Sequence, residues 1–282
     1  VMSKPVLDND NFKPLATEDK QRAREQWSQD PCGAESDRDS EFGTRQYFDE
    51  VERVRYQEYA PWMPELMGFK SYAGARLLEV GCGMGTDLLQ FARGGALCTG
   101  IDLTPRSIAI TRQRFALYKQ RVDLLISDGE RLPFANDTHD VVYSNGVLHH
   151  TPDTAAAIRE LHRVLKAGGT AKVMIYHKNS LNYWGELMLH RGVLRGDLLR
   201  GRSPEEIMST WVEYSAHGGR PLVKAYTREQ TVELFKNFRE IKIDVAQLLR
   251  SEIPLLGNLL PEKVFKYFQT NFGWNLIITA KK

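Results

Sequence analysis

The chain has 282 residues, of which 42% are hydrophobic and 26% are charged, the composition of a folded globular protein with one large domain or two small ones. Its 38 basic and 36 acidic residues nearly cancel and interleave along the sequence, so no nucleic-acid partner is expected. The three cysteines lack paired spacing, which predicts a reducing, cytoplasmic compartment. No run approaches the roughly 18 apolar residues of a membrane span, and the polar first twenty residues do not resemble a signal peptide.

The first seventy residues divide into two segments of different composition. Residues 1–43 are polar and charged and are expected to form a flexible arm around one short helix near 17–28. Residues 44–70 carry apolar and aromatic side chains at helical spacing, interrupted by Pro61. This second segment is predicted to be a helical cover in front of the main domain.

From residue 71 to residue 177, short β-rich apolar runs alternate with amphipathic segments, which predicts a parallel sheet covered by helices. Helix starts are marked at Thr104-Pro105 and Pro152-Asp153, and Gly168-Gly169 is predicted to end the last of these helices. Strands are expected at 76–81, 97–102, 122–127, 140–145 and 170–177, with helices at 86–93, 104–119 and 153–165.

The remainder of the chain contains two stretches that do not follow this alternation. Residues 178–225 and 247–272 are too long for ordinary connections and hold apolar and aromatic side chains, so both are predicted to be helical covers. Residues 226–282 otherwise complete the core. A capping-box spacing at Thr227 predicts a helix to about Asn237, and the last two strands are expected at 240–246 and 274–280.

A glycine-rich turn follows the first strand of this core. Gly81, Gly83 and Gly85 permit a tight turn and close approach of a ligand at a helix N-terminus, although glycines can also serve as turn residues only. Asp102 ends the next strand, where a carboxylate can accept hydrogen bonds from both hydroxyls of a ribose. The spacing is G-x-G-x-G, with Glu79 two residues upstream; that carboxylate would repel a pyrophosphate and attract a cation.

This set of residues resembles the class I S-adenosylmethionine-dependent methyltransferases. The similarity continues in order through Ser127 to Phe134, Asp140 to His150 and Leu161 to Gly169. It implies an α/β, Rossmann-like fold with a seven-stranded, mostly parallel sheet, a reversed last strand, helices on both faces and helical insertions over the substrate. The implied cofactor is S-adenosyl-L-methionine, with S-adenosyl-L-homocysteine as product, and Asp128 would accept from the adenine amino group. The implied cofactor-binding residues are Glu79, Gly81, Gly83, Gly85, Asp102, Leu103, Asp128, Gly129, Glu130 and Asn145.

Within that family, the amino-acid sequence of the later motifs is most similar to the small-molecule branch, which includes quinone-biosynthesis and natural-product methyltransferases. The resemblance therefore implies methyl transfer to an oxygen, nitrogen or carbon nucleophile of a small metabolite. Two alternatives stay open: an RNA or protein methyltransferase, and a non-catalytic module that binds the cofactor. The sequence Asn145-Gly146-Val147-Leu148 disfavours the common type of amino-directed base methylation, which uses an Asn/Asp-Pro-Pro-aromatic motif at this place. The oligomeric state is not indicated.

If the reaction needs a base, His150 and His149 are the candidates, because they follow the fourth strand where open α/β sheets bind ligands. Tyr176, His177 and Tyr183, at and beyond the end of the fifth strand, are candidate substrate contacts. For all five residues, ordinary packing is the alternative.

No metal site is expected, because no Cys and His spacing resembles zinc ligation and one accessible thiol, Cys32, cannot hold a metalloid. Two groups of arginines are also of interest. Arg53 and Arg55 lie in the helical cover before the core, where an arginine could take the cofactor's carboxylate, although ordinary packing explains that helix equally well. A second group lies in the first insertion beside Trp184 and Trp211 and would form a basic rim suited to an anionic substrate; its members are Arg191, Arg195, Arg200 and Arg202.

Overall fold

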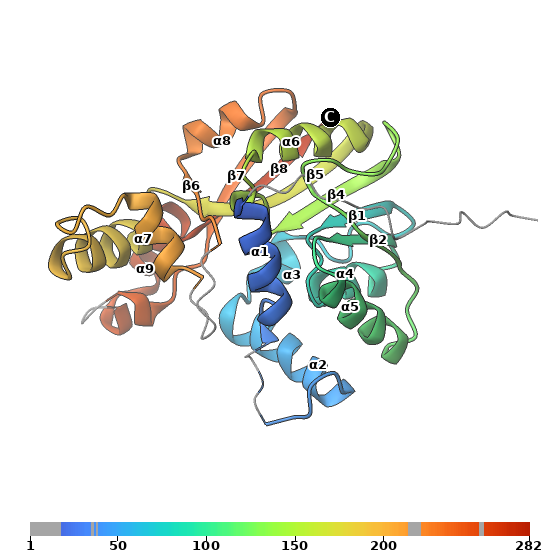
Figure 1. Cartoon of the computed structure of the whole chain (residues 1–282), viewed down its shortest axis with the longest axis horizontal. Coiled ribbons are helices and arrows are strands. Elements are labelled where there is room, and N and C mark those ends of the chain that lie inside the picture. The colour runs from blue at the N-terminus through green and yellow to red at the C-terminus, as the bar shows by residue number, and fades with distance from the viewer. Residues whose placement is uncertain (1–17, 35–36, 38, 214–220, 254–256) are drawn as a thin grey trace, which may run out of the picture.

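The structure is a computed structural model that describes residues 18–34, 37, 39–213, 221–253 and 257–282. Within these residues one sheet of eight strands has the order β3-β2-β1-β4-β5-β8-β7, and the short strand β6 pairs with β5 (Figure 1). The strands are β1 (Arg76–Val80), β2 (Leu97–Asp102), β3 (Asp123–Ile126), β4 (His139–Asn145), β5 (Leu165–His177), β6 (Ala225–Tyr226), β7 (Arg239–Ala246) and β8 (Asn275–Lys281).

Strand directions confirm the predicted α/β sheet with a reversed last strand. Strands β1 to β6 pair in parallel, whereas β8 runs antiparallel to both β5 and β7. The sheet has one strand more than the seven predicted, because the two residues of β6 are too few to produce an alternating pattern. Strand β5 also begins at Leu165 rather than Thr170: Leu165 pairs with His139, and the register then shifts, so Gly168-Gly169 lies inside the strand and does not end the preceding helix.

Helices cover both faces of the sheet (Figure 1). On one face, α4 (Thr86–Arg93) and α5 (Pro105–Leu117) pack against strand residues such as Leu77 and Val141. On the other face, α6 (Thr154–Val164) packs against Leu78 and Val142, and α8 (Arg228–Leu234) lies beside it. Because neighbouring residues of a strand point to opposite faces, both faces of β1 and β4 are apolar and buried.

Four helical segments precede the sheet: α1 (Glu18–Gln29), α2 (Arg45–Arg53), the π-helix η3 (Val54–Tyr59) and α3 (Met63–Leu66). Helix α1 agrees with the helix predicted near 17–28. It lies across the front of the molecule in Figure 1, beside the middle of the sheet. The arm therefore places at least one helix against the core, at the end of the sheet where the site described below lies.

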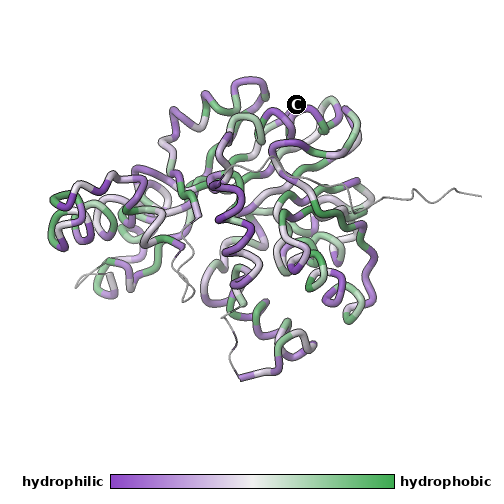
Figure 2. Tube along the Cα trace, in the orientation of Figure 1, coloured by the Kyte–Doolittle hydropathy of each residue, from purple (hydrophilic) through white to green (hydrophobic). Residues whose placement is uncertain are grey.

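The two insertions are helical, as predicted, and form a lobe at one end of the molecule (Figure 1). It contains the π-helix η5 (Asn182–Leu194), α7 (Pro204–Trp211), the short 3₁₀ turns η6 (Arg250–Glu252) and η7 (Gly257–Leu259), and α9 (Glu262–Phe272). Hydrophobic and hydrophilic residues alternate along this lobe in Figure 2. None of the helices in the described part of the chain combines the length and the apolar character needed to cross a bilayer.

Candidate active site

A pocket lies at the carboxyl ends of β1, β2, β4 and β5, the position where open α/β sheets bind ligands. Helix α1 and the π-helix η3 contribute to its walls, and Glu213, two residues beyond α7, reaches it from the lobe. Strands from the core, the N-terminal arm and the first insertion therefore meet around one cavity, which we call the pocket.

The glycine loop after β1 forms part of the pocket wall. Gly81, Gly83 and Gly85 all have positive φ, at 78°, 51° and 70°. A Cβ on Gly81 would come within 2.3 Å of Val147, and one on Gly85 within 2.7 Å of Thr111, whereas a Cβ on Gly83 would meet nothing within 4 Å. The first and third glycines are thus required by packing, and Gly83 leaves open space on the pocket side.

Two buried carboxylates flank this loop. Glu79 is 3% exposed, its Oε2 has no hydrogen-bond partner, and burial, reinforced by the nearby Asp87, raises its pKa well above the usual glutamate value. Asp102 accepts a hydrogen bond at Oδ2 from the Gly83 amide (2.9 Å) and two at Oδ1 from Thr104. Burial raises the pKa of Asp102 despite these hydrogen bonds. The pair is suited to a ligand that brings a cation to Glu79 and hydroxyl donors to Asp102.

Other buried polar atoms in the pocket also lack partners. Ser127 Oγ and Asn145 Oδ1 make no hydrogen bond, although both residues line the pocket, as Glu79 does. Buried polar groups are nearly always hydrogen-bonded in native proteins, so this concentration indicates a ligand with matching polar groups. S-adenosylmethionine fits: its ammonium suits Glu79, its ribose hydroxyls suit Asp102, and its amine donors suit the remaining acceptors.

The pocket contains eight of the ten residues predicted to bind the cofactor. Lining residues are Glu79, Gly81, Gly83, Asp102, Leu103, Asp128, Gly129 and Asn145. Gly85, the N-cap of α4, does not line the pocket, and a Cβ at this position would meet Thr111 of α5. Glu130 also lies outside the lining; its Oε1 accepts from the Asp153 amide (2.7 Å), and it pairs with Lys20. The pocket lining therefore does not include these two predicted residues.

Lys20 of α1 is a component of the site that sequence reasoning missed. Its buried ammonium donates to Asp128 Oδ2 (2.5 Å) and also pairs with Glu130. Burial opposes the charge, but the two carboxylates outweigh it and raise the pKa of Lys20. Asp128, predicted to face an adenine amino group, thus already has a cationic partner from a residue 108 positions away, a separation that no local pattern reveals.

A second ion pair lies in the pocket wall. Arg55 donates from Nε to Asp87 Oδ1 and from Nη2 to Oδ2, both at 2.8 Å. Tyr56 and Tyr143 donate their hydroxyls to the same carboxylate, at 2.6 and 2.8 Å. Although burial opposes ionisation, Arg55 and these hydroxyls hold the pKa of Asp87 below its usual value. Arg55 and Tyr56 both belong to the π-helix η3. Of the three guanidinium nitrogens of Arg55, Nη1 does not bond to Asp87.

His150 presents an unpaired ring nitrogen to the pocket. Its Nδ1 lies 2.8 Å from the carbonyl oxygen of Leu222, which can only accept, so Nδ1 carries the proton and Nε2 carries the lone pair. Nε2 has no hydrogen bond and lies 3.6 Å from Glu213 Oε1. Burial lowers the pKa of His150, against opposing effects of Glu213 and Leu222. The geometry is that of a neutral imidazole able to accept a proton.

Three other predicted site residues do not line the pocket, and each packs against neighbouring residues. His149 is fully buried between His150 and Tyr176, with ring centroids 4.2 and 3.9 Å apart, and burial lowers its pKa well below the usual value. His177 is buried with Nδ1 3.0 Å from the Gly273 carbonyl oxygen. Tyr183 belongs to the apolar cluster of the lobe. Of the candidate base and substrate residues, only His150 and Tyr176 line the pocket.

Trp27, Glu213 and Asn275 also line the pocket and were missed. The Tyr176 hydroxyl donates to Glu213 Oε1 at 2.6 Å, and the Trp27 ring meets His150 edge-on at 5.7 Å. Trp27 is the one with a sequence signal, since an aromatic residue in a polar arm is unusual. Glu213 and Asn275 sit in no motif, and only the tertiary fold brings them to the site.

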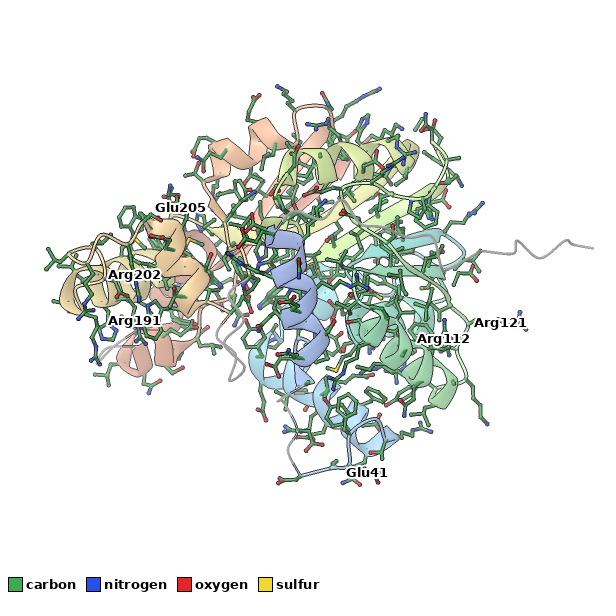
Figure 3. All side chains as sticks on the ribbon, viewed as in Figure 1. Glu41, Arg112, Arg121, Arg191, Arg202 and Glu205 are labelled. Atoms are coloured by element: carbon green, nitrogen blue, oxygen red, sulfur yellow. The ribbon has the colours of Figure 1, made fainter. Side chains whose placement is uncertain are left out.

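The predicted basic rim is wrong, because none of its arginines lines the pocket. Arg191 pairs with Glu186 (2.8 Å) and stacks over Trp211, and Arg202 pairs with Asp197 (3.1 Å). Figure 3 shows Arg191 and Arg202 on the lobe. They hold the lobe together and provide no cation to an anionic acceptor in the pocket.

The cysteines do not form a reactive group. Cys82 and Cys98 are buried, and Cys32, at the pocket, has its pKa raised to about 11 by burial, with a smaller contribution from Glu213. The Cys32 thiol is therefore protonated near neutral pH. Among the described residues, no group of three or more His, Cys, Asp or Glu side chains is placed to hold a metal ion.

Comparison with known proteins places the pocket in a family. Residues 78–173 match the family described as "Methyltransferase domain". They form a class I methyltransferase domain. The match runs from β1 through most of β5 and so contains the glycine loop, Asp102, Asp128 and His150. The cofactor of this domain family is S-adenosyl-L-methionine.

Curated relatives match over the same region. A sterol 4-C-methyltransferase of Caenorhabditis elegans is 34% identical over 101 residues, which are 35% of this chain and 30% of the relative. A ubiquinone biosynthesis O-methyltransferase of Xanthomonas oryzae pv. oryzae is 39% identical over 98 residues, 34% of this chain and 41% of the relative. The chain thus spans less than half the length of these relatives.

Solved structures show the same fold over more of the chain. A SAM-dependent methyltransferase from Thermotoga maritima is 19% identical with a TM-score of 0.52, and the similarity covers 84% of this chain and 96% of that one. A second, from Mesorhizobium loti, is 18% identical with a TM-score of 0.53 and covers 80% and 99%. The Rossmann-like architecture is therefore common to all three.

Proposed function

We propose that the protein transfers a methyl group from S-adenosylmethionine to a nucleophile of a small molecule, with His150 as the base. The observation that carries this proposal is the pocket's division into two ends. Glu79, Asp102 and the glycine loop lie at the ends of β1 and β2, whereas Tyr176 lies in β5, His150 follows β4, and Glu213 reaches the pocket from the lobe. A cofactor site and an acceptor site thus share one cavity.

At the cofactor end, each residue has a distinct task. Glu79 would bind the cofactor's ammonium, and Asp102 would bind its ribose hydroxyls. The open space at Gly83 would let the cofactor come close to the backbone of the glycine loop. Arg55 Nη1 is the candidate donor for the cofactor's carboxylate. When bound, the cofactor supplies a methyl group on a sulfonium, and the electrons of the broken bond stay on sulfur.

At the acceptor end, His150 Nε2 would remove the proton from an O–H or N–H nucleophile. Its tautomer is fixed by Leu222, and the carboxylate of Glu213, 3.6 Å away, would stabilise the imidazolium that forms. The protein would also align the acceptor and exclude water, because α1 and the lobe form part of the pocket walls.

Several features favour a small acceptor over RNA or protein. The relatives include a sterol 4-C-methyltransferase and a ubiquinone biosynthesis O-methyltransferase. The balanced charge of the chain does not favour RNA. The three free cysteines are consistent with the reducing, cytoplasmic compartment that we also propose.

Turnover separates the proposed enzyme from its alternatives. We would incubate the protein with S-adenosylmethionine and a panel of small O–H, N–H and acidic C–H acceptors and measure S-adenosylhomocysteine. We expect acceptor-dependent product, reduced about 10²-fold or more by His150→Gln. Cofactor binding without turnover on any acceptor would favour a non-catalytic module. Retention on an RNA column at moderate salt would favour the RNA alternative.

A further inference from the structure

Glu213 brings a carboxylate into the acceptor end of the pocket. Its Oε1 accepts from the Tyr176 hydroxyl at 2.6 Å and lies 3.6 Å from the neutral His150 ring. Among the residues that the structure describes, no lysine or arginine lies within ion-pairing distance, and the side chain is 19% exposed. A sheltered carboxylate of this kind favours the binding of a cation.

The other cations of the pocket are already committed. Lys20 is bound by Asp128 and Glu130, and Arg55 is bound by Asp87. An anionic acceptor would therefore meet the Glu213 carboxylate with no cation assigned to it, which is unfavourable in a partly desolvated cavity. The charge at this end selects for a positively charged group.

Aromatic side chains line the same pocket as this carboxylate. Trp27, Tyr59 and Tyr176 line the pocket, and Trp27 contacts the His150 ring edge-on. Burial raises the pKa of Tyr59 to about 12, with smaller contributions from Cys32 and Glu213, so the phenol stays neutral and near that charge. Aromatic faces around a carboxylate stabilise an ammonium ion through its attraction to the ring quadrupole.

Two buried acceptors that line the same pocket as Glu213 have no hydrogen-bond partner. His150 Nε2 and Asn275 Oδ1 are unpaired, their residues are 6% and 3% exposed, and both line the pocket. Asn275 pairs in register with Tyr176, whose hydroxyl binds Glu213. An alkylammonium has three N–H donors, and this end of the pocket offers three acceptors: the carboxylate, the imidazole nitrogen and the amide oxygen.

We propose that the acceptor is an amine that binds in its ammonium form to Glu213, with His150 Nε2 and Asn275 Oδ1 as the other acceptors. This inference rests on the proposed function and specifies its acceptor class. Glu213 is then the residue that determines specificity for a cationic acceptor over a neutral or anionic one.

Three probes of similar shape test the proposal: phenethylamine, 2-phenylethanol and 3-phenylpropionate, titrated by calorimetry into the protein saturated with S-adenosylhomocysteine. The amine should bind at least about tenfold more tightly than the alcohol, and the carboxylate most weakly. Glu213→Gln should remove the preference for the amine. Glu205→Gln makes the same charge change on the first turn of α7, at an exposed position that does not line the pocket (Figure 3). This control variant should keep the preference for the amine.

The readout distinguishes this inference from the proposed function. Affinity for S-adenosylhomocysteine should stay within about twofold in Glu213→Gln, which also shows that the variant is folded. Equal binding of the three probes, or an amine preference that survives Glu213→Gln, would overturn the inference. So would the absence of binding by phenethylamine and by methylamine at millimolar concentration. Failure of S-adenosylhomocysteine itself to bind would count against the proposed function instead.

Discussion

Arg55 and Asp87 lie 32 positions apart and form a two-pronged ion pair, with both N···O distances at 2.8 Å, in the wall of the pocket. The pair joins the N-terminal π-helix to the first helix after the glycine loop. Tyr56 and Tyr143 complete the hydrogen bonding of the carboxylate. The helical cover before the core is thus fixed to the cofactor end of the core through a buried charge.

Removing the cation should destabilise the protein. Arg55→Met leaves Asp87 buried with two hydroxyl donors and no positive charge, so we expect a loss of roughly 3 kcal/mol in the free energy of unfolding. Denaturant titration would measure this loss in the free energy of unfolding. Arg53→Met is the control: it removes an exposed ion pair and should have little effect. The pKa of Asp87 is lowered in the folded protein, so the stabilisation that this ion pair provides is complete at pH values above the ordinary aspartate pKa of 3.8. It is lost as the pH falls below that value. A difference that grows on acidification would contradict this account.

Cofactor binding should release a proton from Glu79. Burial raises the pKa of Glu79, so this carboxyl is protonated in the free protein at a pH below its raised value. An ammonium placed against its unpaired Oε2 favours the ionised form and expels the proton. Calorimetry with S-adenosylhomocysteine in two buffers of different ionisation enthalpy would measure the release, which Glu79→Gln should abolish. Equal heats in both buffers for the unmodified protein would contradict the assignment.

The pH dependence of turnover should report His150. A base acts when deprotonated, and burial lowers the pKa of His150 below 6.5, so kcat/KM should be constant through neutral pH and fall only as the pH drops through that lowered value. Glu213 raises the pKa of His150, so Glu213→Gln should move the acidic limb to lower pH. A limb centred above pH 7, or one unchanged in both Glu213→Gln and His150→Gln, would rule out His150 as the base.

The ion pairs of Lys20 should hold α1 in place. Lys20→Met leaves Asp128 and Glu130 close together without a cation, so α1 should detach more often and trypsin should cleave at Arg22 and Arg24 faster. Gln21→Met changes an exposed neighbour on the same helix and should leave the cleavage rate nearly unchanged. Equal rates for the two variants would show that these ion pairs do not anchor the helix.

The sequence predicted the parts of the fold that depend on local pattern. Strand β2 and helix α4 have the predicted bounds, because apolar runs and capping residues mark their ends. The glycine loop and Asp102 were found because the turn requires positive φ and the acid follows a strand. These features are encoded within about ten residues of one another.

The acceptor end could not be predicted in this way, since its residues come from distant elements. Glu213 follows α7 and Asn275 opens β8; no spacing rule connects either residue to β4. The sequence also could not show which of the two adjacent histidines, His149 or His150, presents a ring nitrogen to the pocket. The Leu222 carbonyl, which is distant in sequence, orients His150. Packing, and not local pattern, decided each case.

Calorimetric titration with S-adenosylhomocysteine tests the central claim most directly, with NAD as the competing ligand class. The account predicts micromolar binding of S-adenosylhomocysteine and none of NAD. Asp102→Ala should weaken binding about 100-fold through loss of the charge-assisted hydrogen bonds to the ribose, and Asp123→Ala, at an exposed position at the start of β3, should bind normally. No binding by the folded protein, or equal binding by both variants, would contradict the assignment of this pocket to the cofactor.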